Sequence, residues 1–127
     1  MIELKNLSFS YENSSEAKGQ LRGIDLHVKK GELVILSGRS GCGKTTVGRC
    51  LVRLYEPTDG QIFFDGLDIA HLGEKPLAPY RRRMQMIFQD PAGSLNPRMR
   101  VSELIEEPLL IHTDMSAEAV SYTHLRA

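Results

Sequence analysis

The residues of this sequence that could do chemistry are concentrated between positions 38 and 46. The stretch 38–45 reads G-R-S-G-C-G-K-T and fits the pattern G-x-x-x-x-G-K-[S/T] without a mismatch. Its glycines let the backbone turn sharply, so that successive N–H groups can form a cradle for an anion. Lys44 would supply a mobile charge for the β- and γ-phosphates of a nucleotide, and Thr45 a hydroxyl oxygen for Mg²⁺. The pattern predicts a phosphate-binding loop composed of Gly38, Arg39, Ser40, Gly41, Cys42, Gly43, Lys44, Thr45 and Thr46.

Such a loop needs a strand before it and a helix after it, and the sequence offers both. Residues 33–36 form an unbroken apolar run, which predicts a strand buried on both faces of a parallel sheet. Residues 45–54 fit a helix, whose N-terminus would add the positive end of its dipole. The alternative is a glycine-rich turn that binds nothing, and these flanking elements argue against it.

The remaining pattern indicates antiparallel strands first and a strand–loop–helix unit afterwards. It predicts strands over residues 2–11 (with Asn6 disturbing the alternation), 21–28, 61–66 and 84–88, and helices over 76–83 and 101–110. Pro108 should end or bend the last helix. Residues 12–20 and 89–100 are polar or rich in turn formers and are predicted to be loops. The fold class is therefore α/β with a β-rich flank.

Composition excludes several classes of function. The 16 basic and 16 acidic residues cancel, so charge gives no argument for a nucleic-acid partner. No apolar run approaches the ~18 residues of a membrane span, and the first residues lack the layout of a signal peptide. The two cysteines, Cys42 and Cys50, lack metal or disulfide spacing; Cys50 is expected in the core and Cys42 as a passive loop side chain.

Four segments together resemble one family, the ABC ATPases. Residues 31–46 look like its Walker A region, 57–66 like its P-T-x-G-x-I stretch, and 84–91 like its Q-loop strand. The run S-L-N-P-R-M at 94–99 is similar to the ATPase subunits of dipeptide, oligopeptide and nickel importers. The resemblance covers about residues 2–119. It implies the first half of a P-loop NTPase (RecA-like) core with an antiparallel β subdomain.

The resemblance also implies roles for two residues outside the loop. Gln89 matches the Q-loop glutamine, a catalytic position from which its amide would reach Mg²⁺, together with Thr45, or the attacking water. Tyr11 matches the aromatic residue that stacks on adenine. The alternatives are a polar residue ending a strand for Gln89 and an ordinary strand aromatic for Tyr11.

Other parts of the family pattern are not found in the sequence. Asp65 follows an apolar run and imitates a Walker B aspartate, but Gly66 stands where a glutamate is expected, so Asp65 is interpreted as a hairpin-turn residue. No LSGGQ-like signature or switch histidine is recognised. We therefore expect residues 1–119 to be the N-terminal part of a nucleotide-binding domain, truncated, with marginal folding and ATP turnover near background. Residues 120–127 do not resemble the family and are expected to be a non-native tail.

The resemblance implies the energy-coupling subunit of an importer for peptides or nickel, using ATP and Mg²⁺. A second ABC ATPase subunit and membrane-spanning importer subunits would be its partners, with no nucleic acid and no direct contact with the cargo. It would sit at the cytoplasmic face of the inner membrane, peripherally, through those partners. The alternatives are a non-transport ABC ATPase, another P-loop class such as a kinase or GTPase, and a truncated nucleotide-binding remnant without turnover.

Overall fold

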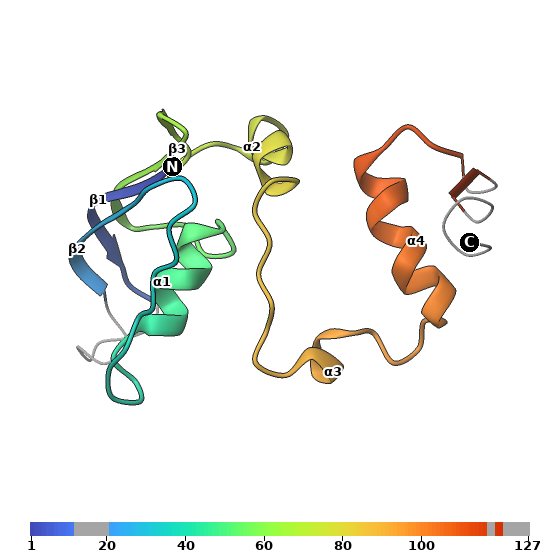
Figure 1. The fold of residues 1–127 in the computed structure, drawn as a ribbon, viewed down its shortest axis with the longest axis horizontal. Coiled ribbons are helices and arrows are strands. Elements are labelled where there is room, and N and C mark those ends of the chain that lie inside the picture. Colours follow the sequence, from blue (N-terminus) through green and yellow to red (C-terminus); the bar gives the residue numbers. More distant parts are fainter. Residues whose placement is uncertain (12–20, 117–118, 121–127) are drawn as a thin grey trace. The chain divides into compact units, whose positions relative to one another are not determined.

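The computed structural model describes residues 1–11, 21–116 and 119–120, and it divides the chain into two compact units. The first unit spans Met1–Met86 and the second spans Ile87–Ala127 (Figure 1). The predicted loop at 12–20 and residues 121–127 of the predicted tail lie outside the described residues.

The first unit is built on a four-stranded sheet. Its strands are β1 (Ile2–Phe9), β2 (Leu21–Val28), β3 (Asp59–Phe64) and β4 (Leu67–Asp68), in the spatial order β2-β1-β3-β4. Every neighbouring pair is antiparallel. The predicted antiparallel β-rich flank is therefore confirmed, and its strands coincide closely with the predicted ones.

Asn6 interrupts β1 as the sequence pattern predicted, and it does so as a β-bulge. Its φ is +50°, and the pairing of β1 with β2 shifts register between Leu4 and Leu7. Because of the extra residue, Leu4 and Leu7 both turn their side chains into the core although they are three positions apart, with 1% and 0% exposure. The Asn6 N–H, which leaves the regular ladder here, donates to Asp25 Oδ1 at 2.8 Å.

The Asp65–Gly66 pair forms the predicted tight turn between β3 and β4. Both residues have positive φ, +49° and +87°, as a two-residue type I′ turn requires. The Asp65 carboxylate pairs with the Met1 ammonium at 2.7 Å and with Arg83. Hydrogen bonds from the N-terminus, and then from Arg83, lower the pKa of this carboxyl. Asp65 is thus a hairpin residue and not a Walker B aspartate.

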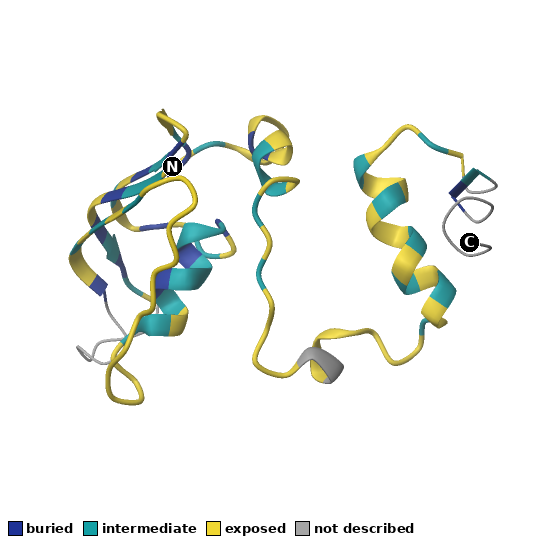
Figure 2. Cartoon of the chain, in the orientation of Figure 1, coloured by how far each residue is buried: buried dark blue, intermediate teal, exposed yellow. Residues whose placement is uncertain are grey.

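Helix α1 (Lys44–Leu51) packs on this sheet and completes the core (Figures 1 and 2). Its buried residues, Val47 and Cys50, join apolar side chains from β1 and β3 in one cluster. Cys50 has 0% exposure, so its predicted core position is confirmed. The helix ends three residues before the predicted Leu54, because Arg53 adopts a left-handed conformation with φ of +55°.

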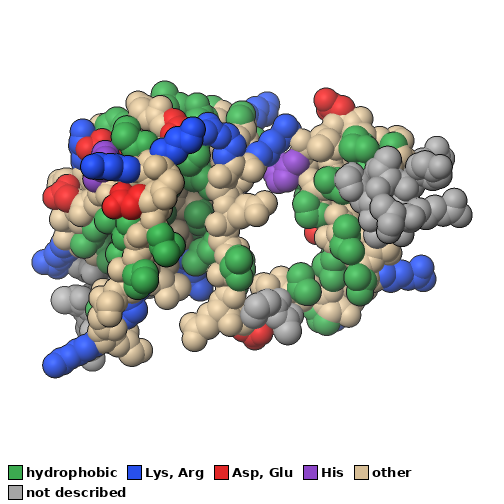
Figure 3. All heavy atoms as spheres, viewed as in Figure 1, with side chains coloured by type: hydrophobic (Ala, Val, Ile, Leu, Met, Phe, Trp, Pro, Cys, Tyr) green, Lys and Arg blue, Asp and Glu red, His purple; other side chains and the backbone are tan. Residues whose placement is uncertain are grey.

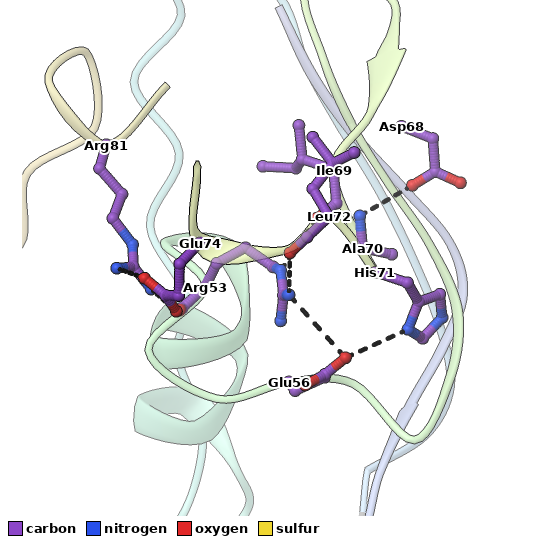
Figure 4. A network of polar contacts seen from close by, with 9 residues as sticks. All are labelled: Arg53, Glu56, Asp68, Ile69, Ala70, His71, Leu72, Glu74 and Arg81. Carbon is purple, nitrogen blue, oxygen red and sulfur yellow. Dashed lines mark hydrogen bonds and ion pairs between the residues drawn. The ribbon is translucent and has the colours of Figure 1, made fainter. Parts of the chain in front are cut away.

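Arg53 is a buried arginine that fastens the end of α1 to the chain beyond β4. It is 7% exposed, and its guanidinium donates to the carbonyl oxygens of Ile69 at 2.9 Å and Leu72 at 3.2 Å (Figure 4). Its own carbonyl accepts from Arg81, which lies in α2 (Glu74–Arg81) and also pairs with Glu74. Helix α2 was predicted over 76–83, so it is confirmed with a shift of two residues.

The two predicted strands of the parallel core are not formed, and this corrects the sequence interpretation. Residues 33–36 have no regular secondary structure, and Leu33 and Ile35 are 87% and 81% exposed. Residues 84–88 are likewise irregular, and Ile87 is 90% exposed. A strand requires a hydrogen-bonded neighbour, and every strand in the described part of the chain belongs to the antiparallel sheet.

The second unit contains α3 (Pro91–Ser94) and α4 (Val101–His112). The predicted helix over 101–110 is confirmed, and α4 continues past Pro108 to His112, so Pro108 does not end it. Pro108 lacks the N–H that would donate to the carbonyl four residues earlier. Every side chain of α4 stays at least partly exposed, including Val101 at 72% and Ile111 at 65%. No helix in the described ranges is long and apolar enough to cross a membrane.

The exposed run at 33–36 should make the chain associate. Replacing Leu33 and Ile35 by lysine should reduce association measured by light scattering, because it removes apolar surface without opening the core. Amide exchange in β1 and β3 should stay unchanged. Leu4→Lys is the matched control: at 1% exposure it buries a charge and should abolish that protection. If the double lysine variant loses the protection as well, residues 33–36 are packed rather than exposed.

Arg53 should stabilise the first unit. Arg53→Met leaves two carbonyl oxygens without their donor and should lower the free energy of unfolding by about 2 kcal/mol. Arg82→Met, at an exposed position, is the control and should change the free energy of unfolding little. The measurement is the midpoint of urea unfolding, monitored through the amide exchange of β3. Equal midpoints for both variants would contradict the role given to Arg53.

Candidate functional site

The candidate site is the loop that leads into α1, and its central feature is the uncapped N-terminus of that helix. The first helical hydrogen bond runs from the Val47 N–H to the Gly43 carbonyl at 2.9 Å. The N–H groups of residues 44–46 therefore have no acceptor within the helix. Among the described residues no side chain caps this end, and the first turn carries no acidic residue. Three donors and the positive end of the helix dipole converge there, which is an anion-binding arrangement.

Gly43 makes this entry into the helix possible. It has φ of +93° and ψ of 3°, a left-handed conformation that side chains rarely adopt. A Cβ at this position would also lie only 2.6 Å from Cδ2 of Leu21. Leu21 belongs to β2 and is buried, so a side chain here would have to displace a core leucine as well as adopt positive φ. The glycine in the sequence pattern is thus required by close packing as well as by backbone conformation.

Lys44 is enclosed by its own loop. Its ammonium donates to the carbonyl oxygens of Gly38 and Arg39, each at 2.8 Å, and lies 3.3 Å from Sγ of Cys42. Within the part of the chain that the structure describes, no carboxylate is paired with this ammonium. A positive charge is therefore fixed at the mouth of the N–H cradle, where an anion could accept from it.

The other loop residues have simpler environments. Arg39, Ser40, Gly41, Cys42 and Thr45 are exposed, and Thr46 is half-buried. Thr45 is the residue after Lys44 in the first turn of α1. Its side chain offers a hydroxyl, a hard oxygen ligand of the kind Mg²⁺ prefers. Cys42 is a free thiol in contact with the Lys44 ammonium, so it takes part in the loop's hydrogen bonding rather than standing passively in it.

Tyr11 lies just after the end of β1 and is 41% exposed. Its ring meets the Phe9 ring edge to face, with centroids 4.8 Å apart, and the Tyr55 ring likewise at 5.8 Å. The sequence analysis did not identify Tyr55 or its partner Arg49. The signal available was weak: a basic residue in the middle of the predicted helix and an aromatic residue six positions later.

Gln89 belongs to the second unit, whereas Tyr11 and the loop belong to the first. The nine loop residues all lie in the first unit, so the predicted role of Gln89 beside them stays a prediction. Gln89 is exposed and immediately precedes Asp90, whose carboxylate accepts from the Gly93 N–H at 3.0 Å and so caps α3. In the described ranges no three metal-binding side chains of His, Cys, Asp or Glu type are gathered. The proposed Mg²⁺ ligands Thr45 and Gln89 therefore remain a prediction.

Comparisons with known proteins identify a family match and several sequence relatives. The family model described as ABC transporter matches residues 21–125. The oligopeptide transport ATP-binding protein AppF of Bacillus subtilis is 50% identical over 91 residues, 71% of this chain and 28% of that protein. The oligopeptide transport ATP-binding protein OppF of the same organism is 43% identical over 116 residues, covering 88% and 37%. The chain spans about a third of the length of the curated relatives it matches.

The chain is also similar in fold to solved structures. The dimeric post-hydrolysis structure of the ATP-binding cassette MJ0796, bound to ADP and Pi, superposes with a TM-score of 0.76 at 29% identity. The similarity covers 96% of this chain and 53% of that one. A second dimeric structure, of MJ0796 as a bacterial ABC transporter cassette, gives 0.76 at 30% identity.

The two thiols should differ sharply in reactivity, and the difference tests the site. Cys42 is exposed and should react with iodoacetamide at pH 8, whereas burial raises the pKa of Cys50 to about 11, against a lowering by Arg53. A pKa of 11 leaves about one thiolate in a thousand at pH 8, so Cys50 should stay unmodified in the folded chain. Because the pKa of Cys50 is raised in the folded chain, its contribution to the free energy of unfolding is fully present below pH 9.0, the ordinary pKa. That contribution is lost as the pH rises towards 11.

Inorganic tripolyphosphate should slow the modification of Cys42 about tenfold at ten times its dissociation constant, because the occupied loop excludes the reagent. Mass spectrometry of the alkylated chain measures both thiols at once, with Cys50 as the internal control. Unprotected Cys42 under saturating tripolyphosphate would place anion binding elsewhere.

Proposed function

Because the chain belongs to the ABC transporter family, we propose that it binds Mg·ATP through residues 38–46 and couples nucleotide to transport within a longer subunit. Its fold is that of an ABC ATPase cassette over the part present. The observation that carries the proposal is the N-terminus of α1. Its first N–H groups have no helical acceptor, and Lys44 stands at the same end with its charge fixed by loop carbonyls.

Each loop residue would contact a different part of the bound Mg·ATP. The N–H groups of residues 44–46 would donate to phosphate oxygens, and Lys44 would exchange a carbonyl partner for the β- and γ-phosphates. Thr45 would bind Mg²⁺ by its hydroxyl, and Gln89 by its amide oxygen. When bound, the cation neutralises developing phosphate charge. Tyr11 would stack on the adenine, a contact that needs no base-specific hydrogen bond.

The transport role rests on what the relatives are named for. AppF and OppF are oligopeptide transport ATP-binding proteins, and we propose a peptide as cargo, with nickel as the other candidate. A second ABC ATPase subunit would bind head to tail; the solved cassettes that the chain resembles are dimeric. Membrane-spanning importer subunits would hold the protein at the cytoplasmic face of the inner membrane, and the cargo would not touch this subunit.

Binding without turnover is the second candidate for this chain taken by itself. The one aspartate that follows an apolar strand in the described sheet, Asp65, is engaged with the N-terminus and Arg83. No Walker B aspartate followed by a glutamate is recognised in the sequence. Without a positioned base, phosphoryl transfer loses most of its acceleration.

Lys44→Ala should weaken binding of Mg·ATP about 10- to 100-fold, the scale of a charge-assisted hydrogen bond. Lys30→Ala, in the exposed turn after β2, is the control and should bind within about twofold of the parent chain. Titration calorimetry gives the affinities, and phosphate release should be at background in all three. Equal affinities of the two variants would refute the assignment of the loop. Turnover that Lys44→Ala abolishes would refute the second candidate.

A further inference from the structure

Three aromatic rings of the first unit form a cluster with a defined geometry. Phe9 and Tyr55 stack nearly parallel, with centroids 5.1 Å apart and an interplanar angle of 8°. Tyr11 stands perpendicular to both, at 84° to Phe9 and 80° to Tyr55. Tyr11 therefore contacts both rings of the stacked pair at once. Two perpendicular contacts restrict the rotation of a ring that is 41% exposed.

Arg49 ties Tyr55 to the phosphate-loop helix. Its Nη1 donates to the Tyr55 hydroxyl at 2.7 Å, and its guanidinium carbon lies 5.3 Å from the centroid of the same ring. The Tyr55 N–H also donates to the Arg49 carbonyl at 3.2 Å. Arg49 is a residue of α1, so the position of Tyr55 is set by the helix whose N-terminus forms the cradle.

The cluster is connected to the loop through β2. Phe9 is paired with Leu21 across the sheet, and Leu21 packs directly against Gly43. Tyr11 follows Phe9 by two residues and therefore leaves the sheet at the end where the loop enters α1. The aromatic cluster therefore adjoins the end of the sheet that packs against the phosphate loop.

We propose that Tyr55, held by Arg49, is a positioning residue that fixes the ring of Tyr11 for stacking on a purine base. The proposal rests on the proposed function, since it assigns how the base of the bound nucleotide is recognised. Tyr55 does not touch the ligand; it acts through Tyr11. Holding an exposed aromatic ring in one orientation before binding reduces the conformational entropy lost when the base stacks on it.

Two probes separate this role from simple packing. ATP contains the base and inorganic tripolyphosphate does not, so positioning of Tyr11 affects only the first. Tyr55→Leu should weaken ATP binding about fivefold, the scale of one aromatic contact, and leave tripolyphosphate binding unchanged. Tyr55→Phe keeps both ring contacts but loses the hydrogen bond from Arg49, so it should recover only part of the ATP affinity. If Tyr55 only packs the core, its loss damages the unit and weakens both ligands together.

A double-mutant cycle tests whether Tyr55 acts through Tyr11. Tyr11→Ala should also weaken ATP selectively, and adding Tyr55→Leu to it should cause no further loss, because the residue being positioned is already gone. Additive losses, or an unchanged ATP affinity in Tyr55→Leu beside normal tripolyphosphate binding, would overturn this inference alone. Failure of the parent chain to bind tripolyphosphate would overturn the proposed function and this inference with it.

Discussion

The uncapped first turn of α1 is the feature on which the rest of the structure depends. A helix that must present its N–H groups to an anion cannot satisfy them with a side-chain cap, which ordinarily contributes about 1 kcal/mol. Its stability must come from elsewhere. Val47 and Cys50 anchor it in the core, Arg53 fastens its other end, and the left-handed Gly43 is held against Leu21. The antiparallel sheet thus serves as the support that keeps the binding end of α1 in place.

A second constraint explains why much apolar surface stays exposed. The runs at 33–36 and 84–88 have the composition of buried parallel strands, and in this structure they lie outside the sheet. Helix α4 in the second unit likewise has apolar side chains in contact with solvent. The antiparallel part forms because its pairings are all present between residues 2 and 68. A parallel sheet needs strands that these runs do not find within the described chain, so local sequence alone does not fold them.

Much of this could be predicted from the sequence wherever the signal is local. The Asp65–Gly66 turn, the disturbance of the strand at Asn6 and the burial of Cys50 follow from neighbouring residues and were predicted correctly. The phosphate loop has a nearly unique pattern, so its place before α1 was predictable. The strand at 33–36 was predicted wrongly because apolar composition reports what a segment could bury, not whether a partner is available. Tyr55 and Arg49 were missed because their contacts join residues whose types are ordinary.

The central claim is that backbone N–H groups at the start of α1 bind a polyphosphate. The most direct measurement is a titration of the ¹⁵N-labelled chain with inorganic tripolyphosphate, followed by amide chemical shifts. The account predicts saturable shifts centred on the amides of Gly41, Gly43, Lys44, Thr45 and Thr46, with one dissociation constant for all of them. Shifts spread over the basic residues 81–83 without saturation, while the loop amides stay fixed, would contradict it.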